Sequence, residues 1–181
     1  MDDFSITDEL MFRVHGAIER RGFFTMGVLG GPASPPWSYT IGFLERGHPE
    51  LVTLGLAPES ADRLFVHASA LLDEGAPPGI GRSHRHDWNG LTIGLIDVPW
   101  VQWTEGSDLV SGMVSYYGMR GGFPCEPGVA QVVWPDEAGH LAWDRGCDPT
   151  MREVQPLLDE VAWDRDAEPG TCGPECDLWH G

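Results

Sequence analysis

The spacing of apolar residues changes several times along the chain, from helical to extended and back, and this pattern predicts an α+β fold. Residues 7–21 carry an apolar residue every three or four positions, which predicts an amphipathic helix. Residues 23–29, 37–44 and 51–56 are short apolar runs separated by turns rich in glycine and proline. Such runs predict three strands that pair in sequence as an antiparallel meander.

The remainder of the chain adds helices and strands to this meander. An apolar stripe that follows Pro58 predicts a second helix, because proline is favoured in the first helical turn. A later stretch rich in glycine, proline, arginine and histidine predicts a loop. We expect helices over residues 58–72, 109–117 and 151–163, the last interrupted at Pro156, strands over residues 91–98 and 130–134, and a loop over residues 76–90. The expected fold is therefore α+β, with a mainly antiparallel sheet covered by two or three helices.

The length of the chain predicts a single domain. A chain of 181 residues can bury one sizeable core. Residues 164–181 are polar and interrupted by glycine and proline, so we expect them to form a loosely ordered tail. Residues 1–163 are then the folded domain.

The charge of the chain narrows the range of functions. Eleven basic residues oppose 28 acidic ones, and the formal net charge of −17 repels phosphate polyanions. Nucleic acid and anionic membrane are therefore not expected as partners. All eleven basic residues are arginine, and the absence of lysine excludes a Schiff base to pyridoxal phosphate, a phosphate-binding P-loop and a kinase-type lysine.

The N-terminus and the cysteines bear on location. The chain begins with acidic residues where a secretory signal needs basic ones, and no apolar run reaches the ~20 residues needed to cross a bilayer. We therefore expect a cytoplasmic protein. In that compartment Cys125, Cys147, Cys172 and Cys176 are expected to be thiols.

Two segments of the sequence resemble the bacterial family known as domain of unknown function 4262. The first reads WSYTIGF over residues 37–43 and continues with GHPEL over residues 47–51. The second reads QVVWPD over residues 131–136 and is followed by Gly139, Trp143 and QPLL over residues 155–158. One departure is Ala142, where the family is expected to carry proline. The resemblance covers roughly residues 22–158 and implies no activity, cofactor or catalytic residue.

Polar residues gather at the ends of the predicted strands. Histidine with two carboxylates can act as an acid and base near neutral pH, and strand ends commonly hold ligands. We expect catalytic roles for His48, Glu50 and Asp136, and ligand binding by Tyr39, Thr40, Gln131 and Trp134. The structural alternative is that these residues stabilise turns and fill the core.

Two further groups could hold a metal ion such as zinc. His84 and His86 project to the same side of an extended segment, as two metal ligands can. Cys172, Cys176 and His180 provide three soft ligands near the C-terminus. The alternatives are a solvated loop for the histidines and free thiols on a tail for the cysteines.

Three hypotheses of function follow from these residues. The first is a small-molecule enzyme or binding domain that uses the pocket around His48 and Glu50. The second is an interaction module, such as an immunity or accessory protein, whose acidic face binds a basic protein partner. The third is a metal-binding domain, or a flavin-binding one suggested by the eight tryptophans, among them Trp100 and Trp103. The oligomeric state stays open.

Overall fold

The computed structural model describes residues 6–31, 34–73, 79–88, 90–104 and 107–160. Its helices and strands follow the α+β pattern expected from the sequence, and the predicted tail, residues 164–181, lies outside the described residues. In chain order the elements are α1 (Ile6–Arg21), β1 (Phe24–Val28), β2 (Trp37–Ile41), the 3-10 helix η1 (Leu44–Arg46), β3 (Glu50–Leu54), α2 (Pro58–Asp73), β4 (His86–Trp88), β5 (Leu91–Asp97), the 3-10 helix η2 (Trp100–Gln102), α3 (Ser111–Met119), β6 (Val129–Val133) and α4 (Met151–Val154).

The strands form a six-stranded sheet in the order β1-β2-β3-β6-β5-β4. The first three pair antiparallel as the predicted meander, with Met26 opposite Tyr39 and Tyr39 opposite Val52, so this prediction is confirmed. Strands β3 and β6 run parallel, and all other neighbours run antiparallel. The sheet is therefore mainly antiparallel, as expected.

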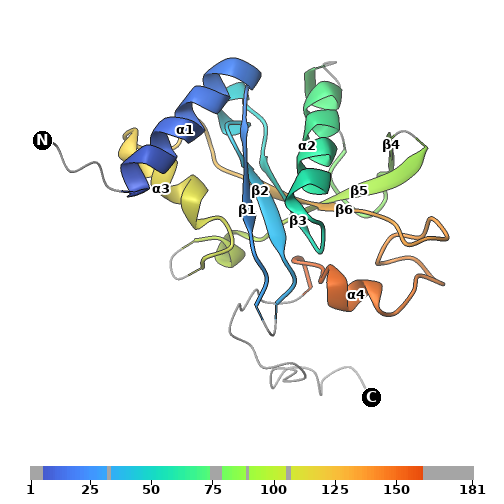
Figure 1. Ribbon diagram of the computed structural model, residues 1–181. Coiled ribbons are helices and arrows are strands. Elements are labelled where there is room, and N and C mark those ends of the chain that lie inside the picture. Colours follow the sequence, from blue (N-terminus) through green and yellow to red (C-terminus); the bar gives the residue numbers. More distant parts are fainter. Residues whose placement is uncertain (1–5, 32–33, 74–78, 89, 105–106, 161–181) are drawn as a thin grey trace, which may run out of the picture.

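Helices cover both faces of the sheet (Figure 1). Successive strand residues point to opposite faces, so each face carries its own apolar set. Helices α1 and α3 pack on one face, where their apolar residues meet Tyr39, Ile41 and Val52. Helix α2 packs on the other face, against Leu51 and Ala130. The sheet is therefore buried on both sides in its middle, and its central strands β2, β3 and β6 are buried along their whole length, including the polar residues Thr40, Glu50 and Gln131.

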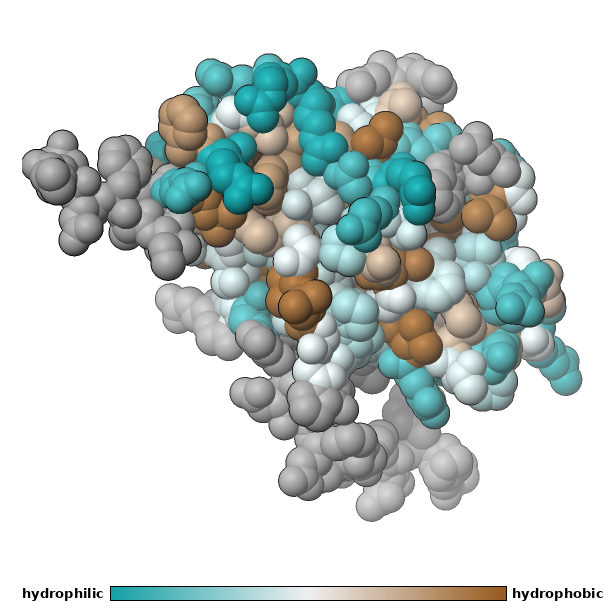
Figure 2. Space-filling view, in the orientation of Figure 1, coloured by the Kyte–Doolittle hydropathy of each residue, from teal (hydrophilic) through white to brown (hydrophobic). Residues whose placement is uncertain are grey.

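The surface is mixed, with hydrophilic residues gathered on the upper part of the face drawn in Figure 2, over helix α1. Hydrophobic residues on that face appear as separate patches. Across the described part of the chain, no helix combines the length and the apolar character needed to cross a membrane.

Strand β4 corrects the prediction of a continuous loop over residues 76–90. His86 pairs with Ile93 and Trp88 with Leu91, so the segment extends the sheet at its edge. The strand is held by backbone hydrogen bonds to β5, and its first two residues, a histidine and an aspartate, carry no apolar alternation. A pattern of side chains therefore could not predict it.

The helix expected over residues 151–163 ends early. Helix α4 spans Met151–Val154, and Gln155 then takes an extended conformation with φ −134°. Pro156 explains this ending, because a proline disfavours helical geometry in the residue before it and lacks the N–H that a helix needs. The strand expected over residues 37–44 also ends early, at Ile41, where Gly42 with φ 126° starts a turn into η1.

Candidate functional site

Glu50 forms the centre of the site because its carboxylate is fully buried at the start of β3. One carboxylate oxygen, Oε1, accepts hydrogen bonds from the backbone N–H of Gly42 at 2.7 Å and of Leu44 at 3.2 Å, and from the Tyr117 hydroxyl at 2.8 Å. The other oxygen, Oε2, accepts from the Thr40 hydroxyl at 2.6 Å. Four donors from β2, the following turn and α3 therefore meet one buried acid.

The local sequence explains how these donors converge. Gly42 takes a φ of 126°, a conformation that favours glycine, and this turns the backbone N–H groups of residues 42 and 44 toward Glu50. Thr40 also accepts a hydrogen bond at 2.8 Å from the backbone N–H of Leu51, so its hydroxyl bridges β2 and β3. The structure thus brings together two of the predicted site residues, Thr40 and Glu50.

Burial dominates the electrostatics of this acid. Removal from water raises the pKa of Glu50, and the hydrogen bonds from Thr40, Tyr117, Gly42 and Leu44 only partly oppose that rise. Within the described residues, no arginine or histidine forms an ion pair with Glu50. Burial likewise raises the pKa of Tyr117, and the neighbouring Glu50 charge adds to this rise. Glu50 therefore keeps its proton to a higher pH than an ordinary glutamate does.

Tyr117 connects the buried acid to a pocket of about 490 Å³, which we call the polar pocket. The lining consists of Glu45 from η1, Tyr117 and Arg120 from α3 and its end, and residues 121–124. The Arg120 guanidinium lies 3.9 Å from the Glu45 carboxylate, so the pocket holds one basic and one acidic side chain. Both are partly exposed and accessible to a ligand.

Tyr116 and His15 extend this group along the rim. The Tyr116 hydroxyl donates to Glu45 Oε1 at 3.3 Å and lies 3.2 Å from His15 Nδ1 on α1. Burial, and then the charge of Glu45, raise the pKa of Tyr116 to about 12. The phenol therefore stays protonated at neutral pH and can act as a hydrogen-bond donor.

His48 and Asp136 do not join Glu50. The His48 side chain is half-buried in the turn before β3, and its backbone N–H donates to the Phe43 carbonyl at 3.1 Å. Asp136 follows the end of β6, whereas Glu50 lies beside Val129 at its beginning. Because β3 and β6 are parallel, Glu50 and Asp136 occupy opposite ends of the sheet, roughly 20 Å apart. The structure therefore does not form the cleft with all three residues that the sequence suggested.

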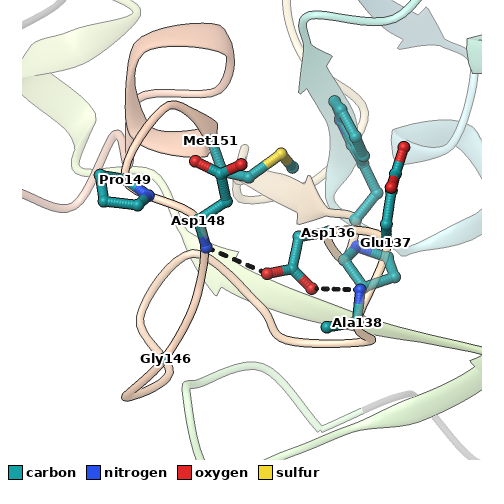
Figure 3. Close-up of a pocket in the computed structure, with 9 residues that line it drawn as sticks. Asp136, Glu137, Ala138, Gly146, Asp148, Pro149 and Met151 are labelled. Atoms are coloured by element: carbon teal, nitrogen blue, oxygen red, sulfur yellow. Dashed lines mark hydrogen bonds between the residues drawn. The ribbon is translucent and has the colours of Figure 1, made fainter.

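Asp136 instead organises a loop (Figure 3). Its carboxylate accepts hydrogen bonds from the backbone N–H groups of Ala138, His140 and Asp148 at 2.9, 2.8 and 3.0 Å. These bonds, with that of His140 the largest, lower the pKa of Asp136. The loop borders an open pocket of about 850 Å³ that Trp134 and Met151 also line. The polar groups of Asp136 are thus engaged within the protein.

The other predicted ligand-binding residues also make internal contacts. The Tyr39 hydroxyl accepts from the backbone N–H of Gly112 at 3.0 Å, and burial raises the pKa of Tyr39 to about 12. Gln131 donates to the Pro156 carbonyl at 2.9 Å and accepts from the Leu158 N–H at 2.8 Å. The Trp134 indole donates to the Leu54 carbonyl at 2.9 Å. Gln131 therefore fastens the segment after α4 to the sheet.

The metal site suggested for His84 and His86 gains no third ligand among the described residues. No group of three or more histidine, cysteine, aspartate or glutamate side chains suited to a metal ion occurs in the ranges that the structure describes. His86 Nε2 contacts the Gly79 carbonyl at 3.1 Å, and His84 Nδ1 contacts the Ser83 hydroxyl at 3.3 Å. The cluster of Cys172, Cys176 and His180 lies outside the described residues.

A third pocket, of about 340 Å³, adjoins the polar pocket, and we call it the aromatic cleft. Trp100 and Trp103 line it from η2 and the residue that follows, Phe123 closes the side shared with the polar pocket, and α3 supplies the opposite wall. Both tryptophans are among those that suggest a flavin-binding domain in the sequence. Tyr117 and Arg120 are not among the residues predicted for the site. Tyr117 lies four residues after Met113, so the sequence places it on the apolar face of the predicted third helix but not near Glu50.

The comparison with known families agrees with the two segments identified in the sequence. A family model described as "Domain of unknown function (DUF4262)" matches residues 17–148, which include strands β1 to β6, the Glu50 site and both adjoining pockets. No curated protein and no solved structure matches the chain. The chain therefore belongs to the DUF4262 family, as its sequence predicted.

Proposed function

We propose that the polar pocket binds a small polar molecule and that Glu50, acting through Tyr117, supplies or receives a proton there. One observation carries the proposal. Glu50 is a fully buried acid with a raised pKa and no ion pair within the described ranges, and it lies one hydrogen bond from a tyrosine that lines a pocket. Perturbed acids beside pockets are typical of binding and catalytic sites.

The geometry supports a division of roles among the lining residues. Arg120 and Glu45 offer one positive and one negative side chain at the mouth of the polar pocket, so they can bind and orient a polar molecule. Tyr117 can donate a hydrogen bond to that molecule when Glu50 carries the proton, because its hydroxyl is then released from a charged acceptor. This arrangement suits general acid and base chemistry.

A fragment screen on the complete protein tests the proposal. We expect 15N NMR with a library of small polar fragments to give hits that shift the amide signals of Arg120, Gly121 and Phe123. Arg120→Gln should weaken these hits about tenfold or more, because it removes a charge-assisted hydrogen bond worth about 1.5–3 kcal/mol. Arg13→Gln, at an exposed position of α1, is the matched control and should leave them unchanged.

The same screen can contradict the proposal. Hits that gather at the Asp136 loop, or hits at the polar pocket that Arg120→Gln does not weaken, would assign ligand binding elsewhere. A library that produces no shift at residues 120–123 would remove the basis for a small-molecule site in this pocket.

The net charge of −17 favours a second candidate, an interaction protein that binds a basic protein partner. Such binding would fall steeply as the salt concentration rises, because it depends on exposed charges. It would also survive Arg120→Gln, which makes the surface more negative. Binding of polar fragments that tolerates salt and is weakened by Arg120→Gln would instead favour ligand binding in the polar pocket.

A further inference from the structure

Three aromatic rings line the aromatic cleft beside a helix that carries hydroxyl groups. Trp100 and Trp103 lie with ring centroids 4.5 Å apart at an interplanar angle of 68°, and Phe123 lies 6.5 Å from Trp103 at 87°. Ser111 and Ser115 of α3 line the other side. Rings inclined to one another in this way form walls in several directions and do not stack into one flat surface.

Trp100 is the most accessible of the three rings. Its side chain is 58% exposed, whereas Trp103 is buried and donates its indole N–H to the Val98 carbonyl at 3.2 Å. Large aromatic side chains that stay in contact with water at the edge of a pocket are typical of ligand-binding surfaces. Trp103 thus forms a fixed wall of the cleft, and Trp100 has exposed surface that a ligand can cover.

The aromatic rings of the cleft and the net charge of the protein favour a positive ligand, and no charged side chain lines the cleft among the described residues. Among the described residues that line it, none is basic, and the lining consists of aromatic, hydroxyl and aliphatic side chains. The Glu45 carboxylate lies in the polar pocket on the other side of Phe123, but Arg120 lies 3.9 Å from it and offsets its charge. The net charge of −17 also raises the concentration of cations near the surface. Aromatic faces attract cations through their quadrupole, and tryptophan does so most strongly.

We propose that the aromatic cleft binds an organic cation with apolar substituents, such as a quaternary ammonium group. The methyl groups of such an ion pack against Trp100, Trp103 and Phe123, and a hydroxyl on the ion can reach Ser111 or Ser115. A volume of about 340 Å³ suits a small ion of this kind. This site shares Phe123 with the polar pocket but uses none of Glu45, Tyr117 and Arg120, so it does not depend on the function proposed above.

Choline and its neutral analogue 3,3-dimethyl-1-butanol, titrated into the complete protein, test this inference. The two molecules have the same shape, but only choline carries a charge. At 0.15 M salt we expect choline to bind at least tenfold more tightly than the neutral analogue, followed by NMR and by tryptophan fluorescence. Trp100→Ala should weaken choline binding about tenfold, in the range of a desolvated cation–π contact.

Two further variants keep the test decisive. Val101→Ala is the control, because Val101 is a more exposed neighbour, at 76%, and does not line the cleft; it should bind choline as the wild type does. Ser115→Arg places a like charge in the cleft from an exposed helical position and should abolish binding even if Trp100→Ala fails to fold.

Three results would overturn the inference. Equal binding of the neutral analogue would show that the cleft recognises shape and not charge. Choline binding that disappears in 0.5 M salt and is insensitive to Ser115→Arg would attribute it to the general surface charge. The absence of choline binding at millimolar concentrations would remove the site.

Discussion

Replacement of Glu50 by alanine is expected to lower the free energy of unfolding by about 4 kcal/mol or more. The variant leaves four donors without an acceptor: the hydroxyls of Thr40 and Tyr117 and the backbone N–H groups of Gly42 and Leu44. Each buried donor left unsatisfied costs about 1–3 kcal/mol, and water that enters the space can recover part of this. Chemical denaturation at pH 7 measures the loss.

Glu50→Gln is the matched control, since glutamine has the same shape and keeps one acceptor oxygen. We expect it to cost much less than Glu50→Ala. The difference in stability between the wild type and Glu50→Gln should also change with pH in a defined direction. The raised pKa means that folded Glu50 keeps its proton where the unfolded chain has lost it, so stability present below the unfolded pKa is lost as the pH rises toward the folded pKa.

The wild type should therefore lose stability relative to Glu50→Gln as the pH increases above about 4.5, by up to about 1.4 kcal/mol per pH unit. A difference that moves in the opposite direction would mean that the hydrogen bonds stabilise the charged form more than burial penalises it. Equal stability of Glu50→Ala and Glu50→Gln at pH 7 would show that the four donors do not depend on this side chain.

Gly42→Ala is expected to cost about 3 kcal/mol or more, because it combines strain with a steric clash. Gly42 has a φ of 126°, and a Cβ there would lie 2.7 Å from the Gly22 carbonyl oxygen and 2.9 Å from the Phe23 Cα. These are backbone atoms, so a rotamer change cannot relieve the contacts. Strained φ values alone cost about 1–3 kcal/mol. The shift needed would also displace the N–H that donates to Glu50.

Gly47→Ala separates these two contributions. Gly47 also has a positive φ, of 75°, but a Cβ there would meet no atom of the described residues within 4 Å. We expect Gly47→Ala to cost about 1 kcal/mol, the price of the left-handed conformation without a clash. If both variants cost the same in urea denaturation, the tight packing of the turn around Glu50 would not contribute to stability.

The fold was predictable where strands that are adjacent in the sequence also pair in the sheet. The three runs of the meander and the helix that begins at Pro58 could be read from apolar spacing and turn residues, because adjacent strands joined by short turns usually pair. Strand β4 could not be read in this way, since backbone pairing at the sheet edge holds a segment that begins with His86 and Asp87. Pro156 was identified as a break, but the end of the helix at Val154 was not.

The candidate site was predictable only in part. Glu50 and Thr40 are close in sequence and lie on adjacent strands of the meander, so the predicted pairing brings their backbones close together. Their hydrogen bond does not follow from the pairing alone, because the register places Thr40 level with Leu51. The position of Asp136 depends on the parallel pairing of β6 with β3, and no local pattern specifies that order. The contact between Tyr117 and Glu50 joins residues 67 positions apart and depends on how α3 packs across the sheet. Long-range packing of this kind leaves no signal in a single sequence.

A titration of the Glu50 carboxyl group is the most direct test of its role as a buried proton donor. Its side-chain carboxyl signal can be followed by 13C NMR over a pH titration of the wild type, with Tyr117→Phe for comparison. The account predicts a midpoint above the ordinary glutamate value of 4.5, because burial dominates, and a further rise in Tyr117→Phe, which lacks a hydrogen bond that favours the charged form. A midpoint at or below 4.5, unchanged in Tyr117→Phe, would contradict the account of Glu50 as a buried proton donor beside the polar pocket.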